Sequence, residues 1–190
     1  VDVPSTVAIK GDADLYRFPG LISSIEKLDE TSASGVMIAI PEVDTVVRRM
    51  PTIIKVDDGI YANFVLQLFA NGQTIKVKAK DGNIKIKAGD TIIEPDSNGN
   101  LYFKFAQPDT FTRYSAIDVL NGNIDPAVFE GKIVIIGITA AGLTTINSIP
   151  TGTVYDHDIY AHAYQSISDG EILVRPSWSE RAELTIMLLF

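Results

Sequence analysis

Residues 75–105 constrain the fold more than any other part of the chain. They contain four short runs rich in β-branched and aromatic residues: Ile75–Val77, Ile84–Ile86, Thr91–Ile93 and Leu101–Phe105. Asp81-Gly82-Asn83 and Asn98-Gly99-Asn100 separate some of the runs, and Gly and Asn accept the positive φ of hairpin turns at low cost. The first two runs alternate apolar and charged residues, which places one face inward and one outward. This region is predicted to be an antiparallel meander.

The flanking regions carry signals for both helices and strands. Helical spacing of apolar residues, together with capping and Asn-Gly or Asp-Gly ends, predicts helices over residues 21–28, 60–69, 115–120 and 159–167. Apolar runs predict strands over residues 7–9, 36–40 and 52–56. Asp125-Pro126 is predicted to begin a further helix, because Asp is a good N-cap and Pro suits the first helical position.

Ile133–Ile136 is a continuous apolar run, which predicts a strand buried on both faces. Strands and helices are therefore mixed, and the fold class is predicted to be α/β, with mixed α+β as the alternative. We expect a mixed sheet with the meander in its middle and helices packed on it. A length of 190 residues suits one domain, over residues 1–178, with a core of ordinary size.

Composition excludes some classes of partner. The net charge of −8 is unfavourable for nucleic acid, because phosphate binding needs clustered Lys and Arg. It also argues against broad contact with an anionic membrane, whereas a role in solubility accounts for most of the charge. The chain has no cysteine, which excludes disulfides, thiolate metal sites and a cysteine nucleophile.

The two ends of the sequence suggest a piece of a longer protein. The chain starts at Val1, without an initiator Met or a signal peptide. Residues Leu184–Phe190 read LTIMLLF, an uncharged run much shorter than the roughly 20 apolar residues of a membrane span. Residues 179–190 could begin a truncated transmembrane helix, or they could be the last helix of a soluble core.

The loop Gly137–Gly142 follows the predicted buried strand. Loops at the carboxyl ends of such strands can bind anions or small ligands. The spacing is not G-x-G-x-x-G and no P-loop Lys follows, so a tight structural turn is the alternative.

The densest polar cluster is formed by Asp156, His157, Asp158 and His162. Asp158 and His162 are four residues apart and would share a helix face. Such a set could bind a divalent metal, but the spacing matches no metal motif, and acids at a helix start serve as caps and favour the helix dipole. We expect no metal and no cofactor.

Arg48 and Arg49 precede Met50-Pro51. An arginine pair can clamp a carboxylate with two hydrogen bonds, or it can form structural ion pairs. No Gly-x-Ser-x-Gly elbow and no paired-carboxylate signature is present, so no catalytic residue is assigned and an enzyme is the least supported class.

Four segments, in this order, resemble the second class of the CHASE family, the sensory extracellular domains associated with cyclases and histidine kinases. They are Asp44–Pro51 (DTVVRRMP), Phe111–Gly122 (FTRYSAIDVLNG), Phe129–Ala140 (FEGKIVIIGITA), and Asp158–Ala163 (DIYAHA) with Arg175-Pro176-x-Trp178. The resemblance covers residues 35–178. Tyr160 stands where the family usually has His, and His162 where it usually has Asn. Family members carry further upstream sequence, so this chain is expected to be truncated at its N-terminus.

The resemblance implies an extracytoplasmic domain, periplasmic or extracellular, of a bacterial inner-membrane receptor. Such receptors continue into membrane helices and a cytoplasmic histidine kinase, adenylate cyclase, diguanylate cyclase or Ser/Thr kinase, and a homodimer is expected. This favours residues 179–190 as the start of a membrane helix, with Trp178 near the interface.

The sequence therefore predicts a sensory input domain that binds a small molecule and passes a conformational change to the membrane. Loops at strand ends are common ligand sites, so the predicted ligand-binding residues are Arg48, Thr139, Asp156 and His157. The alternative is a structural or dimerisation module, or a receiver of a protein partner, without a small ligand. In that case exposed apolar residues on the meander would carry the contact, and a wholly polar outer face would count against it.

Overall fold

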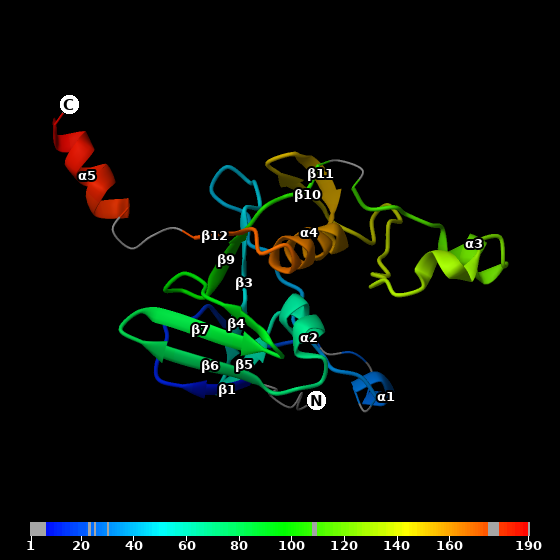
Figure 1. Cartoon of the computed structure of the whole chain (residues 1–190), viewed down its shortest axis with the longest axis horizontal. Coiled ribbons are helices and arrows are strands. Elements are labelled where there is room, and N and C mark those ends of the chain that lie inside the picture. The colour runs from blue at the N-terminus through cyan, green and yellow to red at the C-terminus, as the bar shows by residue number, and fades with distance from the viewer. Residues whose placement is uncertain are drawn as a thin grey trace.

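The computed structural model describes residues 7–22, 24, 26–29, 31–107, 110–174 and 179–189. Its largest sheet has the strand order β1-β6-β7-β8. The strands are β1 (Val7–Lys10), β6 (Ile75–Lys80), β7 (Asn83–Ala88) and β8 (Thr91–Ile93). β1 runs parallel to β6, and β6, β7 and β8 are antiparallel (Figure 1).

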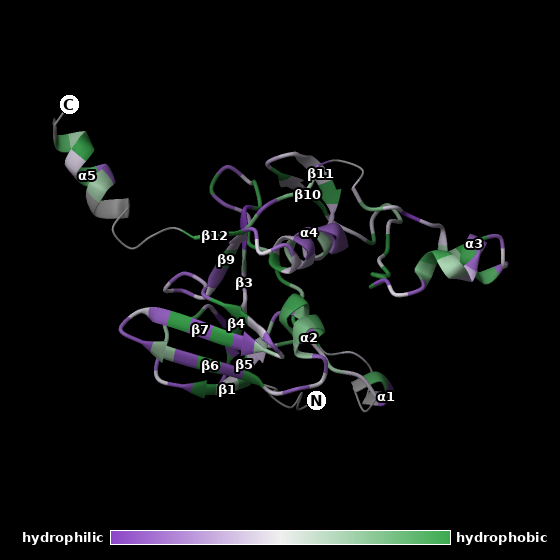
Figure 2. Cartoon of the chain, in the orientation of Figure 1, coloured by the Kyte–Doolittle hydropathy of each residue, from purple (hydrophilic) through white to green (hydrophobic). Residues whose placement is uncertain are grey.

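The β6–β7 hairpin confirms the prediction drawn from the alternating pattern. Asp81 and Gly82 both have positive φ, 51° and 76°, as a two-residue hairpin loop of type I′ requires. Buried and exposed residues alternate along both strands, and Figure 2 shows the matching alternation of hydropathy. The apolar face lies in the core, and lysines occupy the other face.

The fourth run of the predicted meander belongs to a different sheet. β9 (Asn100–Phe103) lies between β3 (Arg49–Pro51) and β12 (Ile172–Leu173), and it does not pair with β8. The turn before β9 is held by Thr52, the residue that follows β3. Thr52 donates to the carbonyl of Gly99 through both its backbone N–H (2.8 Å) and its hydroxyl (2.6 Å). This tie directs β9 alongside β3.

Two smaller sheets complete the strands. One has the order β2-β4-β5, with β2 (Arg17–Phe18), β4 (Ile53–Val56) and β5 (Gly59–Ala62), and the other is the hairpin of β10 (Ile146–Ile149) and β11 (Gly152–Tyr155). β4 confirms the strand expected over residues 52–56. The strand expected over residues 36–40 is wrong, because only Val36 forms a single bridge, to Asn63.

The helix predicted over residues 60–69 begins later than expected. Helix α2 spans Phe64–Ala70, because residues 59–62 pair with β4 as strand β5. Asn63 ends the strand and caps the helix, accepting a hydrogen bond from the backbone N–H of Val65 (3.0 Å). Asn71 closes the helix in the left-handed conformation, as its Asn-Gly signal predicted.

The remaining helices are α1 (Glu26–Asp29), α3 (Ala116–Leu120), the 3-10 helix η1 (Pro126–Phe129), α4 (Asp156–Ser168) and α5 (Ser179–Leu189). Asp125 caps η1 ahead of Pro126, as predicted. α1 is shorter than the helix expected over residues 21–28, of which residues 23 and 25 lie outside the described part of the chain. Trp178 also lies outside it.

The core lies between the sheets and the two helices α2 and α4, which lie side by side (Figure 1). Two ring pairs join these helices: Phe64 with Tyr160, edge to face, and Phe69 stacked on Tyr164 with centroids 4.7 Å apart. The largest fully buried side chains include Met50, Ile53, Leu66, Ile75, Ile86, Leu101, Phe103 and Ile159. The fold is thus a mixed α/β arrangement with helices packed on sheets, as predicted.

The prediction for Ile133–Ile136 is wrong. These residues form no strand, and Ile133, Val134 and Ile136 are 50%, 52% and 89% exposed. A run of branched residues becomes a buried strand only where neighbouring strands and helices cover both faces. None of the described strands pairs with this segment, and three of its four side chains are exposed.

Candidate functional site

The first turn of α4 forms the centre of the candidate site. Asp158 is buried, and its carboxylate accepts hydrogen bonds from the backbone N–H of Tyr155 (3.0 Å) and from Arg113 (3.0 Å). The first contact caps the helix, and the second ties residues 110–114 to it. Because the Arg113 side chain is 52% exposed, it can also reach other groups.

One turn further along α4 lies the buried His162. Its Nδ1 accepts a hydrogen bond from the backbone N–H of Ala106 (3.2 Å), which leaves Nε2 to carry the proton of the neutral ring. Phe111 meets the imidazole edge-on at a centroid distance of 4.9 Å. Burial lowers the pKa of His162, an effect that the Asp158 charge opposes and the Arg113 charge reinforces.

A cavity of about 250 Å³ opens beside these side chains. Its wall is formed by the segment after β9, the β10–β11 hairpin and α4. The polar groups that line it come from Gln107, Thr110, Arg113, Thr151, Thr153 and His162, and the apolar ones from Ala106, Phe111, Ile149 and Val154. Polar and apolar groups thus share the wall about equally, and converging polar groups of this kind can fix the orientation of a small ligand.

A second hollow of about 390 Å³ lies near the β6–β7 turn. Its polar lining consists of Asp12, Asp14, Arg17, Ser97 and Asn98, all of them exposed. Water already solvates such groups, so a ligand gains little from them. The cavity beside His162, which contains a buried polar ring, is the stronger candidate.

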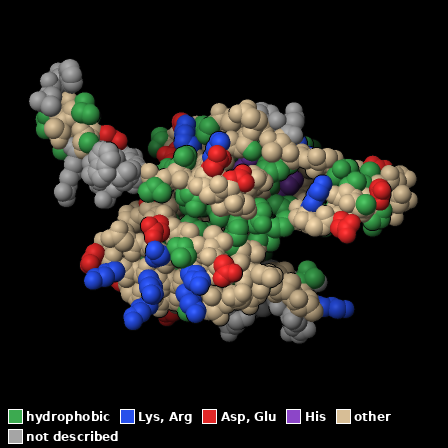
Figure 3. All heavy atoms as spheres, viewed as in Figure 1, with side chains coloured by type: hydrophobic (Ala, Val, Ile, Leu, Met, Phe, Trp, Pro, Cys, Tyr) green, Lys and Arg blue, Asp and Glu red, His purple; other side chains and the backbone are tan. Residues whose placement is uncertain are grey.

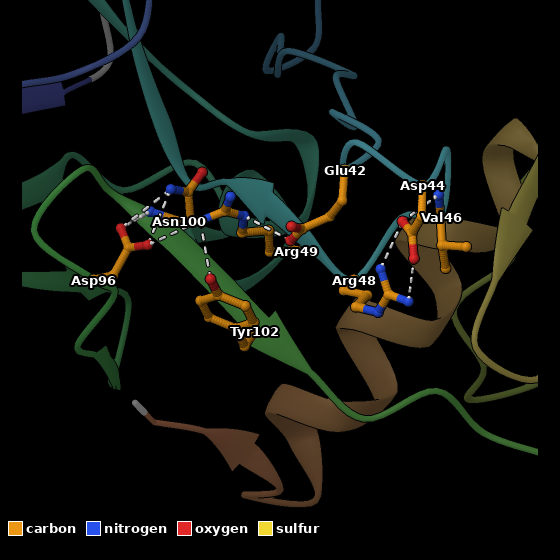
Figure 4. A network of polar contacts seen from close by, with 8 residues as sticks. All are labelled: Glu42, Asp44, Val46, Arg48, Arg49, Asp96, Asn100 and Tyr102. Carbon is orange, nitrogen blue, oxygen red and sulfur yellow. Dashed lines mark hydrogen bonds and ion pairs between the residues drawn. The ribbon is translucent and has the colours of Figure 1, made fainter. Parts of the chain in front are cut away.

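The predicted site residue Arg48 forms a two-pronged ion pair with Asp44, at 2.9 and 2.7 Å (Figure 4). This hydrogen-bonded pair lowers the pKa of Asp44 to about 2. Arg49 bonds Glu42 (3.1 Å) and donates to the hydroxyl of Tyr102 (2.9 Å). Both arginines therefore form ion pairs with side chains of this chain. Arg49 also connects the loop before β3 to strand β9.

The other predicted residues lie around the start of α4. Asp156 accepts a hydrogen bond from the amide of Asn147 (3.2 Å), and His157 lies parallel to the ring of Tyr155. Gly137 touches the imidazole of His157 so closely that a Cβ at position 137 would overlap the ring. The structure therefore brings the Gly137–Gly142 loop and His157 together, with Thr139 exposed.

None of the four predicted residues lines either of the two hollows. Among the described residues, no hydrogen bond or ion pair joins Arg48 to Thr139, Asp156 or His157. The described part of the chain also contains no group of three or more His, Asp or Glu side chains placed to hold a metal ion.

Sequence reasoning missed Arg113, Phe111 and the threonines of the hairpin. Phe111 belongs to a recognised family segment, but Arg113 fell on a variable position within it. His162 and Arg113 are 49 positions apart, so no local spacing could have linked them. Only the packing of residues 106–113 against α4 brings them together.

Tyr160 is the one described buried side chain whose polar atom has no hydrogen-bond partner. Burial raises the pKa of its hydroxyl, and the Asp156 charge raises it further. An unsatisfied buried hydroxyl costs stability, so this residue is a weak point of the α2–α4 contact.

The neutral state of His162 predicts a pH dependence of stability. The unfolded chain binds a proton near the ordinary histidine pKa of 6.5, whereas the folded chain binds it only at lower pH. The unfolded state then holds more protons within that window, so the free energy of unfolding falls as pH drops below 6.5, by at most about 1.4 kcal/mol per pH unit. Urea unfolding at pH 7.5, 6.5 and 5.5 measures this fall.

The variant His162→Gln removes this titration, and His157→Gln is the matched control, since the chain has only two histidines. We expect the pH slope between 7.5 and 5.5 to shrink in His162→Gln and to persist in His157→Gln. Equal slopes in the wild type and His162→Gln would contradict the assignment.

The architecture is a mixed α/β domain with helices packed on its sheets and a hollow beside α4. The chain matches the model of the CHASE2 domain family over residues 6–190, and it belongs to that family. CHASE2 domains are sensory and extracellular, which supports a sensor role and agrees with an extracytoplasmic location. No curated protein and no solved structure matches the chain. No helix in the described part of the chain is long and apolar enough to cross a membrane.

Proposed function

We propose that this chain is the input domain of a bacterial transmembrane signalling receptor, and that its small ligand binds in the cavity beside α4. The observation that carries the proposal is the presence of a buried neutral His162 and a half-exposed Arg113 in the wall of one cavity of about 250 Å³. Burying a polar ring is costly unless its groups find partners, and a bound ligand would supply a partner for Nε2–H.

The polar groups of the cavity favour a ligand that accepts hydrogen bonds. Neutral His162 offers one N–H, the threonines offer hydroxyls, and Arg113 uses one terminal nitrogen for Asp158 and keeps its other donors. A carboxylate would pair with Arg113 through charge-assisted bonds, and Phe111 would cover an apolar part. We therefore propose a small carboxylate-bearing molecule.

The route to the membrane would run through the C-terminal helices. α4 contributes His162 and Asp158 to the site and continues through β12 to α5. In α5, Leu184, Ile186, Met187 and Leu188 are exposed, which suits the start of a membrane helix over residues 179–190. The resemblance implies a kinase or cyclase output and a homodimeric receptor, and a shift of α4 would bias that dimer.

Thermal melting against a panel of small carboxylic acids, amino acids, nucleotides and divalent metals tests the ligand proposal. A ligand that binds only the folded state at 100 times its dissociation constant stabilises it by about 2.7 kcal/mol, which gives a clear rise in Tm. We expect a saturable rise in Tm with a carboxylate. Arg113→Gln is expected to weaken the affinity at least tenfold, and Thr153→Val, which removes a neutral hydroxyl, by a smaller factor. A carboxylate–arginine contact of this kind is worth about 1.5–3 kcal/mol.

Arg48→Gln is the matched control, because it removes the same charge from the residue that the sequence predicted. Loss of binding in Arg48→Gln with retention in Arg113→Gln would move the site to Arg48, Thr139, Asp156 and His157. A panel without any shift, at ligand concentrations up to the millimolar range, would contradict a small-carboxylate sensor.

The exposed run Ile133, Val134, Ile136 and Ile138 favours a second candidate, a module that contacts a protein partner or another copy of itself. Exposed apolar patches of this kind often mark interaction sites. The outer face of the meander, which was expected to carry such a contact, does not support it. Lysines dominate this face, and Ile92 is its one large exposed apolar residue among those described. Light scattering on the samples used for melting separates a ligand-free dimer from a monomeric sensor.

A further inference from the structure

The solvent face of the β1-β6-β7-β8 sheet carries an unusual concentration of lysine. Six of the 16 Lys and Arg residues of the chain project from it: Lys10, Lys76, Lys78, Lys80, Lys85 and Lys87. Figure 3 shows their blue side chains gathered over β6 and β7 in the lower part of the view. We call this surface the lysine face.

The strand register places these like charges directly opposite one another. Lys78 lies between Lys10 on β1 and Lys85 on β7, and Lys76 lies opposite Lys87. Like charges opposite each other on one sheet face destabilise the pairing. The arrangement therefore costs the isolated domain stability.

Few acidic groups neutralise this face. Glu94 on the β8 side pairs with Lys85 (2.8 Å), and Asp81 and Asp90 lie in the adjoining hairpin turns. In the described part of the chain, the other five lysines make no ion pair. The whole chain has a net charge of −8, so this face is a local concentration of positive charge on an acidic protein.

The geometry of the face limits the kind of partner. Lysines on alternate residues of one strand are about 7 Å apart, and neighbouring strands are about 5 Å apart, so the charges form a flat, regular array. Asn83 is the other outward residue of β6 and β7, so these strands present neither an arginine nor an aromatic ring. Single-stranded nucleic acid needs aromatic stacking, and protein hot spots are rich in Trp, Tyr and Arg.

We propose that the lysine face binds a linear polyanion built of phosphate groups, at a site separate from the cavity beside α4. Lysine binds phosphate as a point charge without demanding a particular orientation. A chain of closely spaced phosphates would lie along the rows of lysines, neutralise the opposed charges and release its counterions. Because the protein as a whole is acidic, it would repel the polyanion elsewhere, and binding would be confined to this face.

Binding of inorganic polyphosphate to the full chain, measured by fluorescence anisotropy at 25–200 mM salt, tests this proposal. The variant Lys76→Gln/Lys78→Gln/Lys87→Gln removes three charges from the face and keeps the ion pair between Lys85 and Glu94. The control Lys27→Gln/Lys55→Gln/Lys132→Gln removes three charges from elsewhere. At low salt we expect an affinity loss on the order of 100-fold in the first variant, taking about fivefold per lysine, and less than threefold in the control.

Two further readouts distinguish a binding face from a merely solubilising one. The slope of log affinity against log salt is expected to fall by about two to three in the first variant, because fewer phosphates are neutralised. The same variant is expected to melt at a temperature equal to or above that of the wild type, because it relieves the opposed charges. This result would also show that the variant folds.

The proposal would be overturned if the wild type showed no saturable polyphosphate binding at 25 mM salt, or if both triple variants lost affinity equally. Sedimentation with vesicles containing anionic lipid provides the third arm. Binding to the vesicles, without binding to polyphosphate, would assign the face to a membrane surface instead. None of these outcomes depends on the carboxylate site, since Arg113 lies outside the lysine face.

Discussion

Replacing Phe103 with alanine is expected to lower the free energy of unfolding by about 3–5 kcal/mol. Phe103 is only 1% exposed and lies on β9, the central strand between β3 and β12. Its ring packs on Phe105 with centroids 4.6 Å apart, and β9 contacts α4. Truncation would leave a cavity where this sheet meets the helix. A loss of that size is a large part of the roughly 5–15 kcal/mol that stabilises a typical domain.

Urea unfolding followed by circular dichroism measures this loss. Ile136→Ala is the matched control, because it also removes an apolar side chain but from a position that is 89% exposed. The control is expected to change stability by less than about 0.5 kcal/mol. If Ile136→Ala cost as much as Phe103→Ala, residues 133–136 would be packed in solution, contrary to the structure.

Replacing Asp158 with alanine is expected to cost about 2–4 kcal/mol. The variant loses the cap on the N–H of Tyr155, worth about 0.5–2 kcal/mol, and the ion pair with Arg113. Because Arg113 is half-exposed, water can resolvate its charge, which keeps the cost below that of a fully buried pair. Asp158→Asn retains an acceptor for the cap and should cost about half as much.

Asp156→Ala is the control on the same turn of α4. The Asp156 side chain accepts a hydrogen bond from Asn147, so its loss should cost about 1 kcal/mol or less. Asp158→Asn should also lower the pKa of His162 further, because the Asp158 charge raises it. Histidine titration by NMR measures this shift, and an unchanged His162 pKa would contradict the coupling between the two residues.

Local sequence signals predicted the elements whose structure depends on neighbouring residues. The hairpin between β6 and β7 followed from alternation and from Asp81-Gly82, because a two-residue turn with positive φ needs these residue types. The end of α2 at Asn71 and the cap of η1 at Asp125 followed for the same reason. The order of the four family segments was sufficient to identify the CHASE2 family.

Distant contacts decided the elements that the sequence misassigned. β9 leaves the meander because Thr52 binds Gly99, 47 residues away. Ile133–Ile136 has the composition of a buried strand, but burial depends on what lies beside it, and composition does not encode that. The outward lysines of β6 and β7 were visible as an alternation, whereas their opposition to one another and to Lys10 required the strand register.

The candidate site shows the same division. The polarity of Asp156, His157, Asp158 and His162 was evident from the sequence, and so was the shared helix face of Asp158 and His162. The sequence by itself determined the hairpin, the helix ends, the mixed α/β class and the family, because each depends on local backbone preferences or on motif order. Only the tertiary structure decided that Arg113 and Phe111 meet His162 across a cavity, because that contact joins segments without any sequence spacing in common.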